Sequence, residues 1–284
     1  MKKLIFIIAF MLMGSVSYAD DLAGVSERAS EFIGQLIPGE GHTEASIDLR
    51  NNNKPDFSIL GVREISPIDQ GTIFTQFSLQ NTKKANDTRW VTNLGIGARK
   101  LSADGTMMVG INNFYDYELD TEHMRTSVGL EARSAVLELH YNNYIKLGDG
   151  YNDEMVLSGQ DFQLATQIPH LHWAKAFINA YKWDGDLKDD VEGRKIGSEM
   201  QLTPNLNLEF AHDDKDKASL EDEWYTKLQF VHPGKEGPSA LADGVSDTAW
   251  RENRDMSAEL LSKVKRQNKI VVEFKGTSSI SRAD

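Results

Sequence analysis

The sequence predicts an all-β fold, a twelve-stranded antiparallel transmembrane β-barrel, from three observations. Stretches of about ten residues alternate apolar and polar side chains, as strands with two different faces do. Long acidic or amide-rich connectors alternate with tight turns. After residue 19, no apolar run approaches the length of about 20 residues that a membrane helix needs. The longer connectors are Arg50–Lys54, Asn81–Asp87, Asp116–His123, Lys146–Asp153, Asp184–Asp190 and Asp213–Asp222, and the shorter ones are Ser66–Gln70, Ser102–Gly105, Arg133–Ser134, Pro169–His172 and Pro204–Asn205.

The first residues are typical of a secretory signal peptide. Lys2 and Lys3 precede the apolar run Leu4–Met13, and small residues end the segment at Ala19. We therefore expect cleavage after Ala19. We divide the chain into a signal peptide (1–19), a periplasmic helical segment (20–43), the barrel (44–232), and a linker and tail (233–284).

Composition excludes several classes of function. The formal net charge of −12 argues against nucleic acid as a partner, because binding to phosphates requires a basic face. The chain has no cysteine, so it forms neither a disulfide framework nor a thiolate metal site. We predict no catalytic residue, no cofactor and no metal site.

Residues Trp90–Arg99 form the clearest candidate strand. Apolar side chains occupy mainly its even positions, whereas its odd positions carry polar or small residues. A soluble sandwich shows the same alternation, but the strand lengths, the alternating connectors and charges of both signs on the polar face favour a barrel in lipid. We expect the polar face to line the lumen with Asn93, Gly95, Gly97, Arg99, Gly110, Asn112, Arg125, Gly129, Glu131, Glu138, His140, Lys195 and Glu199.

The remaining strands alternate with varying clarity. An even strand count leaves both ends of the barrel in the periplasm and the longer connectors outside the cell. We expect Val156–Gln167 to hold a bulge or bend at its polar centre. The other candidates are Glu44–Arg50, Phe57–Glu64, Thr72–Gln80, Thr106–Asp116, Met124–Arg133, Ala135–Tyr144, Ala174–Trp183, Lys195–Leu202, Leu206–His212 and Trp224–Val231.

Two segments flank the barrel. Ala23–Ile37 has the apolar spacing of a helix that ends at Pro38-Gly39, and we expect it in the periplasm. After Pro233, a loose linker leads to a predicted helix at Arg254–Arg266 and an extended segment at Asn268–Lys275. We expect this tail to thread the lumen, with the lumen glycines leaving space for it; a disordered periplasmic tail is the alternative. The candidate threading residues are Asn268, Ile270, Val272 and Phe274.

Four segments carry a family resemblance. Thr92–Arg99, Val109–Tyr117 and Arg125–Glu131 resemble the translocator barrel of intimins and invasins, the inverse autotransporters, and Val264–Glu273 is similar to the segment that closes that domain. The resemblance covers about Glu44 to Lys275. It implies a twelve-stranded barrel in a Gram-negative outer membrane, a tail that passes up through the lumen, and assembly by periplasmic chaperones and the barrel-assembly machinery.

The end of the sequence departs from that family. Inverse autotransporters continue into immunoglobulin-like domains and an adhesive tip, whereas this sequence stops at Asp284. We therefore expect the passenger to be absent from this chain. The expected partners are outer-membrane lipid and the assembly machinery, together with a separately encoded passenger or a host surface receptor.

Two other functions are compatible with a barrel. One is a small channel or a protein that binds ligands with its surface loops. The other is an outer-membrane hydrolase, for which His140 with Asn142 and His212 with Asp213 are the candidates. Neither pair has a nucleophile at a recognisable spacing, so we predict that the protein is not an enzyme. We expect His170 and His172 to be turn residues and the acidic loops to be solvated.

Overall fold

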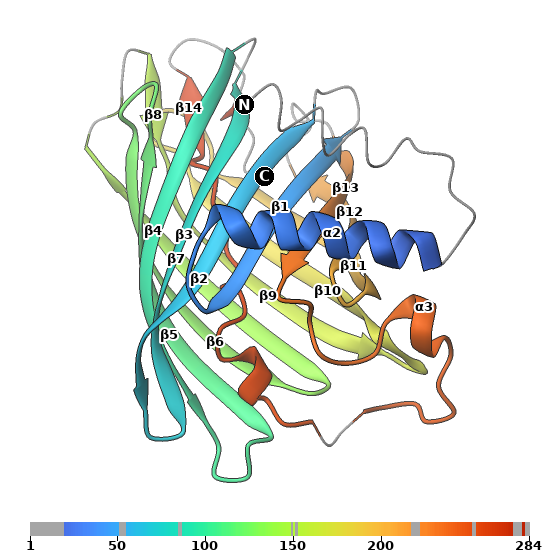
Figure 1. Ribbon diagram of the computed structural model, residues 1–284. Helices are drawn as coiled ribbons and strands as arrows, with labels where there is room; N and C mark the ends of the chain where they lie inside the picture. Colours follow the sequence, from blue (N-terminus) through green and yellow to red (C-terminus); the bar gives the residue numbers. More distant parts are fainter. Residues whose placement is uncertain are drawn as a thin grey trace.

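The computed structural model describes residues 20–50, 55–84, 87–148, 150, 153–216, 222–251, 254–274 and 280–281. In this part of the chain, twelve antiparallel strands close into a barrel, which confirms the predicted fold (Figure 1). The strands are β1 (Gly41–Arg50), β2 (Asp56–Ile68), β3 (Gly71–Lys84), β4 (Asp87–Leu101), β5 (Met107–Glu118), β6 (Met124–Ser134), β7 (Leu137–Leu147), β9 (Ser158–Ile168), β10 (Leu171–Asp184), β11 (Val191–Thr203), β12 (Leu206–Lys215) and β13 (Glu223–His232).

The two faces of the barrel wall differ sharply in polarity. Leu94 and Ile111 are 61% and 54% exposed on the outside, whereas Asn93 and Asn112 beside them are 1% and 3% exposed. Side chains on a strand alternate between faces, so the whole wall presents apolar groups outward and polar groups inward. Closure through β1 and β13 leaves no barrel strand with an unpaired edge in lipid.

The first helix packs on the outer wall of the barrel. Helix α2 (Asp20–Leu36) lies across the first and last strands in Figure 1, and its Ile33 is buried among Leu206 and Phe230. Phe230 shares the outward face of β13 with Trp224, which is 46% exposed. The helix was expected in the periplasm, and it contacts the end of the barrel with the short turns. Its place on the wall follows from its apolar stripe, which covers an apolar patch of strand.

A close contact fixes the helix in position. A Cβ atom on Gly34 would lie 2.3 Å from the His232 ring, so only glycine lets the helix approach so near. The Ser30 hydroxyl donates to the carbonyl of Val231. In the described part of the chain, no helix is both long and apolar enough to cross a bilayer.

A second, small sheet lies beyond the barrel wall at the end with the long connectors. It pairs β8 (Glu154–Val156) with β14 (Val272–Phe274), and β14 with β15 (Ile280–Ser281). The strand predicted at Val156–Gln167 is therefore broken at Leu157, whose N–H donates to the carbonyl of Val271. The bend predicted within this strand exists, but it precedes the polar centre.

The chain after β13 is mostly irregular. Helix α3 (Ala240–Asp243) and the 3-10 helix η1 (Ser257–Glu259) are its only described helices. The helix predicted at Arg254–Arg266 is wrong, because only its short η1 part is helical among residues 254–266. Figure 1 shows the last part of this segment running inside the barrel.

Candidate functional site: the lumen and its threaded segment

The tail enters the barrel at the end that carries the short turns. The N–H of His170 donates to the carbonyl of Ala249, and that of Met256 donates to the carbonyl of Gly105. His170 and His172 each contact a carbonyl of the tail through a ring nitrogen, at 2.9 Å. His170 lies in the turn, as predicted, whereas His172 lies in strand β10, and both residues anchor the incoming segment.

Inside the lumen, side chains of the wall hydrogen-bond the backbone of the tail. Carbonyls from Leu260 to Asn268 accept hydrogen bonds from Arg99, Arg133, Asn142, Arg125 and Asn93. The Oε1 atom of Gln76 accepts from the N–H of Val264, and the Tyr144 hydroxyl accepts from the N–H of Gln267. These contacts satisfy backbone groups that a helix would satisfy internally. This explains why a sequence with helical spacing is irregular here.

Each basic residue of the tail between 263 and 269 meets a carboxylate of the wall. Lys263 lies 2.7 Å from Glu44, Arg266 lies 2.7 Å from Asp116, and Lys269 lies 2.7 Å from Asp56. Lys265 pairs with Glu199. The carboxylates belong to β1, β5, β2 and β11, so the segment is held from several sides of the barrel. Charge complementarity therefore fixes the register of the tail in the lumen.

Asp116 is the centre of this arrangement. Its carboxylate is fully buried and accepts hydrogen bonds from Arg125, Arg266 and Asn93. The guanidinium of Arg266 also lies 4.3 Å from the ring centroid of Phe114, close enough for a cation–π contact. One wall carboxylate thus connects a wall arginine to the tail.

A second buried network lies nearer the short turns. Glu131 accepts hydrogen bonds from Arg99 at 2.7 Å and from Arg133 at 2.7 Å. His140 lies between Glu131 and Glu138, 4.0 and 3.6 Å away. Because both arginines also bind carbonyls of the tail, this network joins three strands to the segment that threads the lumen.

The tail leaves the lumen as a strand at the end with the long connectors. Ile270 and Val272 are fully buried in a cluster with Val91 and Val156. The carboxylate of Glu273 accepts hydrogen bonds from the N–H groups of Asp186 and Leu187, in the connector between β10 and β11. The segment therefore spans the lumen from one mouth to the other.

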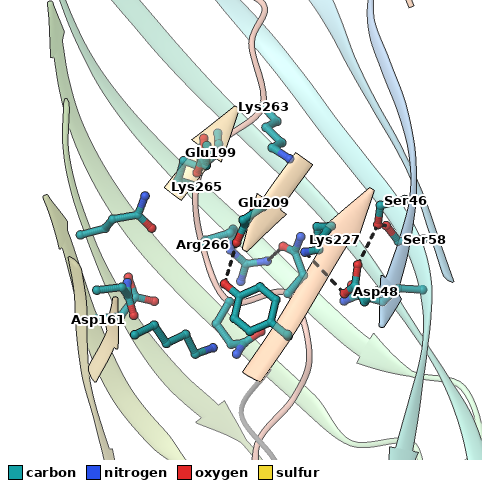
Figure 2. Close-up of a pocket in the computed structure, with 18 of the residues that line it drawn as sticks. Ser46, Asp48, Ser58, Asp161, Glu199, Glu209, Lys227, Lys263, Lys265 and Arg266 are labelled. Atoms are coloured by element: carbon teal, nitrogen blue, oxygen red, sulfur yellow. Dashed lines mark hydrogen bonds and ion pairs between the residues drawn. The ribbon is translucent and has the colours of Figure 1, made fainter. Parts of the chain in front are cut away.

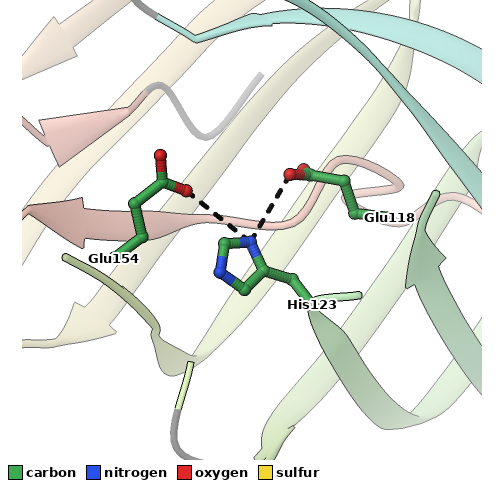
Figure 3. A group of neighbouring side chains, drawn as sticks. All are labelled: Glu118, His123 and Glu154. Carbon is green, nitrogen blue, oxygen red and sulfur yellow. Dashed lines mark ion pairs between the residues drawn. The ribbon is translucent and has the colours of Figure 1, made fainter. Parts of the chain in front are cut away.

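A cluster of ion pairs holds strands together at the point where the tail leaves the lumen. Figure 3 shows the Nδ1 atom of His123 directed at two carboxylates, 3.4 Å from Glu118 and 3.7 Å from Glu154. Arg89 donates to Glu154 at 2.5 and 2.6 Å and to Glu118 at 3.1 Å. One guanidinium thus bridges both carboxylates, and the His123 ring lies between the same two groups. It ties β4 and β5 to β8, the strand with which the tail pairs.

The predicted lumen residues lie on the inner face of the wall. Asn93, Arg99, Asn112, Arg125, Glu131, Glu138 and His140 are all buried there. Lys195 and Glu199 line a cavity beside the tail. Among the predicted threading residues, Asn268 offers its carbonyl to Asn93, and Ile270, Val272 and Phe274 belong to the apolar exit cluster. The proposed signal cleavage site at Ala19 lies outside the described residues.

The lumen glycines make room for side chains of neighbouring wall strands and not for the tail. A Cβ on Gly95 would lie 2.4 Å from the Phe114 ring, and one on Gly97 would lie 2.4 Å from the Phe74 ring. At Gly110 it would meet Glu131, and at Gly129 it would meet Asn112. The expectation that these positions leave space for the tail is therefore corrected, because side chains of the wall fill that space.

The two histidines considered as catalytic residues of a hydrolase, His140 and His212, have contacts that do not fit catalysis. Among the described residues, no hydroxyl hydrogen-bonds to His140, and Asn142 donates instead to Asp161 and to the tail. The ring of His212 packs 4.5 Å from Trp224, which is on the outer wall. In the described part of the chain, neither ring is hydrogen-bonded to a hydroxyl that it could activate as a nucleophile.

Comparison with known proteins decides the family. A family model described as "Inverse autotransporter, beta-domain" matches residues 20–268. The chain belongs to the inverse autotransporter family. It is 25% identical over 215 residues to the inverse autotransporter adhesin YeeJ of Escherichia coli K12, a match that covers 70% of this chain and 9% of that protein. It is 28% identical over 124 residues to a putative attaching and effacing protein homolog of the same strain, covering 44% of this chain and 39% of the relative.

A solved structure shares the fold. A chain from a study of the in-meso crystallization of membrane proteins superposes with a TM-score of 0.66 at 19% identity, covering 82% of this protein and all of that chain. The inverse autotransporter described here is thus a bacterial outer-membrane barrel and a translocator domain of type V secretion. Its family and its adhesin relative belong to a non-enzymatic class, as predicted. The chain spans well under half the length of both curated relatives.

Proposed function

We propose that this inverse autotransporter barrel anchors a polypeptide in the outer membrane and holds it across the lumen, so that the chain beyond the exit is displayed on the cell surface. The supporting observation is the matched charge of tail and wall, in which Lys263, Lys265, Arg266 and Lys269 meet Glu44, Glu199, Asp116 and Asp56. A segment bound in this way resists withdrawal toward the periplasm, because each pair would lose a buried partner.

The displayed polypeptide serves adhesion in this proposal. The relatives include a protein named as an adhesin, and β14 directs the tail out of the mouth with the long connectors. The passenger is either encoded separately or continues from the tail. Export requires removal of the signal peptide after Ala19, and assembly requires periplasmic chaperones and the barrel-assembly machinery.

Disulfide trapping in cells tests the threaded arrangement. Val156 and Val272 are directly opposite in the β8–β14 pairing and share one buried cluster, so cysteines at both positions are close enough to bridge. The chain has no cysteine of its own, so any disulfide reports this pair. We expect Val156→Cys with Val272→Cys to crosslink in the outer membrane of living cells.

A matched pair supplies the control. Ser257 belongs to the same tail but lies near the short turns, at the other end of the barrel from Val156. The pair Val156→Cys with Ser257→Cys should therefore stay reduced. A second variant, with Asp284 extended by an epitope tag, should bind antibody on intact cells. Crosslinking equal in both pairs, or a tag accessible only after the outer membrane is permeabilised, would contradict the proposal.

A further inference from the structure

The tail leaves part of the lumen unfilled on one side. The tail backbone hydrogen-bonds mainly to β4, β6 and β7, and a cavity of about 160 Å³ lies on its other side, where the side chains of Lys263 and Lys265 reach β1 and β11. A second cavity, of about 100 Å³, opens among residues of the short-turn end such as Trp173 and Lys235. Both cavities are lined largely by charged and amide side chains, which favour water over an empty space.

The two cavities share one boundary. Glu199, Lys263 and Lys265 line both of them. Figure 2 shows these residues together beside the tail, with Lys227 and Asp48 across the first cavity. Lys265 is paired with Glu199, and Lys263 is paired with Glu44. Two lysine–glutamate pairs thus separate a polar space in the mid-lumen from one near the periplasmic mouth.

The second cavity has an excess of positive charge. Among the described residues, seven lysines and arginines line it against four glutamates. Lys235 has no carboxylate within ion-pair distance in the described part of the chain, and the charged groups near it are Lys263, Lys265, Glu259 and Glu44. A passage with such a lining raises the local concentration of anions and lowers that of cations.

We propose that the two cavities form a side passage for small ions along the tail, that the Lys263–Glu44 and Lys265–Glu199 pairs constrict it, and that it prefers anions. The inference depends on the tail lying in the lumen but not on display of a passenger. The passage opens when the two lysine side chains move aside or are replaced by shorter ones. The tail itself stays in place, because it is held by independent contacts at Asp116 and Asp56.

Planar-bilayer recording on the full chain tests the passage. All variants carry the Val156→Cys and Val272→Cys disulfide, so that the tail cannot leave the lumen. In a potassium chloride gradient, we expect brief, small openings whose reversal potential lies toward that of chloride. The double variant Lys263→Ala, Lys265→Ala removes the constriction and should conduct several-fold more current.

A control separates gating from the loss of any lysine–carboxylate pair. Lys182 of β10 is paired with Asp190, is more than a third exposed and lines neither cavity. Lys182→Ala should therefore leave the current unchanged. The inference is overturned if the double variant forms the disulfide and stays silent, if Lys182→Ala conducts as much as the double variant, or if the current of the parent barrel prefers potassium. A disulfide without current would reject the passage and leave the proposed threading intact.

Discussion

Asp116 is the residue on which the buried charge of the lumen depends most. Its carboxylate faces Arg125 of the wall and Arg266 of the tail, and all three side chains are fully buried. Asp116→Ala leaves two guanidinium groups close together without a carboxylate. We expect a loss of about 3–5 kcal/mol in the free energy of unfolding. Urea unfolding of the barrel in lipid vesicles, followed by tryptophan fluorescence, measures this change.

A surface ion pair provides the comparison for Asp116. Asp190 lies 2.6 Å from Lys182, but both side chains are more than a third exposed. Solvent screens such a pair, so Asp190→Ala should leave the unfolding midpoint unchanged. Equal effects of the two substitutions on unfolding would show that burial of the Asp116 carboxylate does not increase its contribution to stability.

Gly95 gives a second prediction at the scale of single residues. Its missing side chain admits the Phe114 ring, on which the guanidinium of Arg266 stacks. Gly95→Val overpacks the wall and should cost roughly 1–3 kcal/mol of unfolding free energy. The substitution Ala98→Val, in the same strand but on its lipid-facing side, should be tolerated in the same urea titration. Restoration of stability in Gly95→Val by Phe114→Leu would identify the ring as the cause, and a Gly95→Val barrel as stable as the parent would refute it.

At the scale of elements, the sequence was informative where local periodicity decides structure. The strand Trp90–Arg99 was recognisable because its faces differ, and the wall has that polarity along its whole circumference. The predicted helix at 254–266 failed because its backbone is satisfied by Arg99, Arg133 and Asn142, which are distant in sequence. Propensity describes a segment alone, whereas a wall of donors can favour an extended chain.

The same limit applies to the other missed features. Pairing of β8 with β14 joins residues that are far apart in the chain, so no short pattern could reveal it. The lumen candidates were recognisable one by one as polar positions of alternating strands. Their partners in the tail were not, because the match between Asp116 and Arg266 depends on how far the tail advances through the barrel.

Helix α2 yields a prediction for a whole element. Its docking surface combines β1, β12 and β13, so the surface exists only after the barrel has closed. Ile33 is 1% exposed at this contact, and Ile33→Asp would bury an unpaired carboxylate. We expect the folded form, seen by its faster migration on unheated gels, to be lost at a lower temperature. Glu31→Gln on the exposed face of α2 should behave as the parent, and identical melting of the two variants would show that the helix does not secure the closure.

For the whole molecule, closure and charge act together. The outer wall needs only apolar contact with lipid, so the polar residues of twelve strands are free to form a charged interior. That interior both holds the tail and leaves a polar space beside it. A barrel filled by apolar packing could hold a plug but would not admit ions, so in this proposal the charged interior links anchoring to conduction.

Lys235 makes the ion preference of the whole molecule depend on pH. Lys235 follows β13, outside the membrane-spanning strands, and burial together with Lys263 lowers its pKa to about 8. The positive charge is therefore present well below that pH and is lost as pH rises through about 8, so the preference for chloride should weaken over the same interval. Reversal potentials in bilayers across that range measure the change. Lys235→Arg keeps its charge throughout and should abolish the pH dependence, because arginine stays protonated. If the parent and Lys235→Arg show the same pH profile, another group controls the periplasmic mouth.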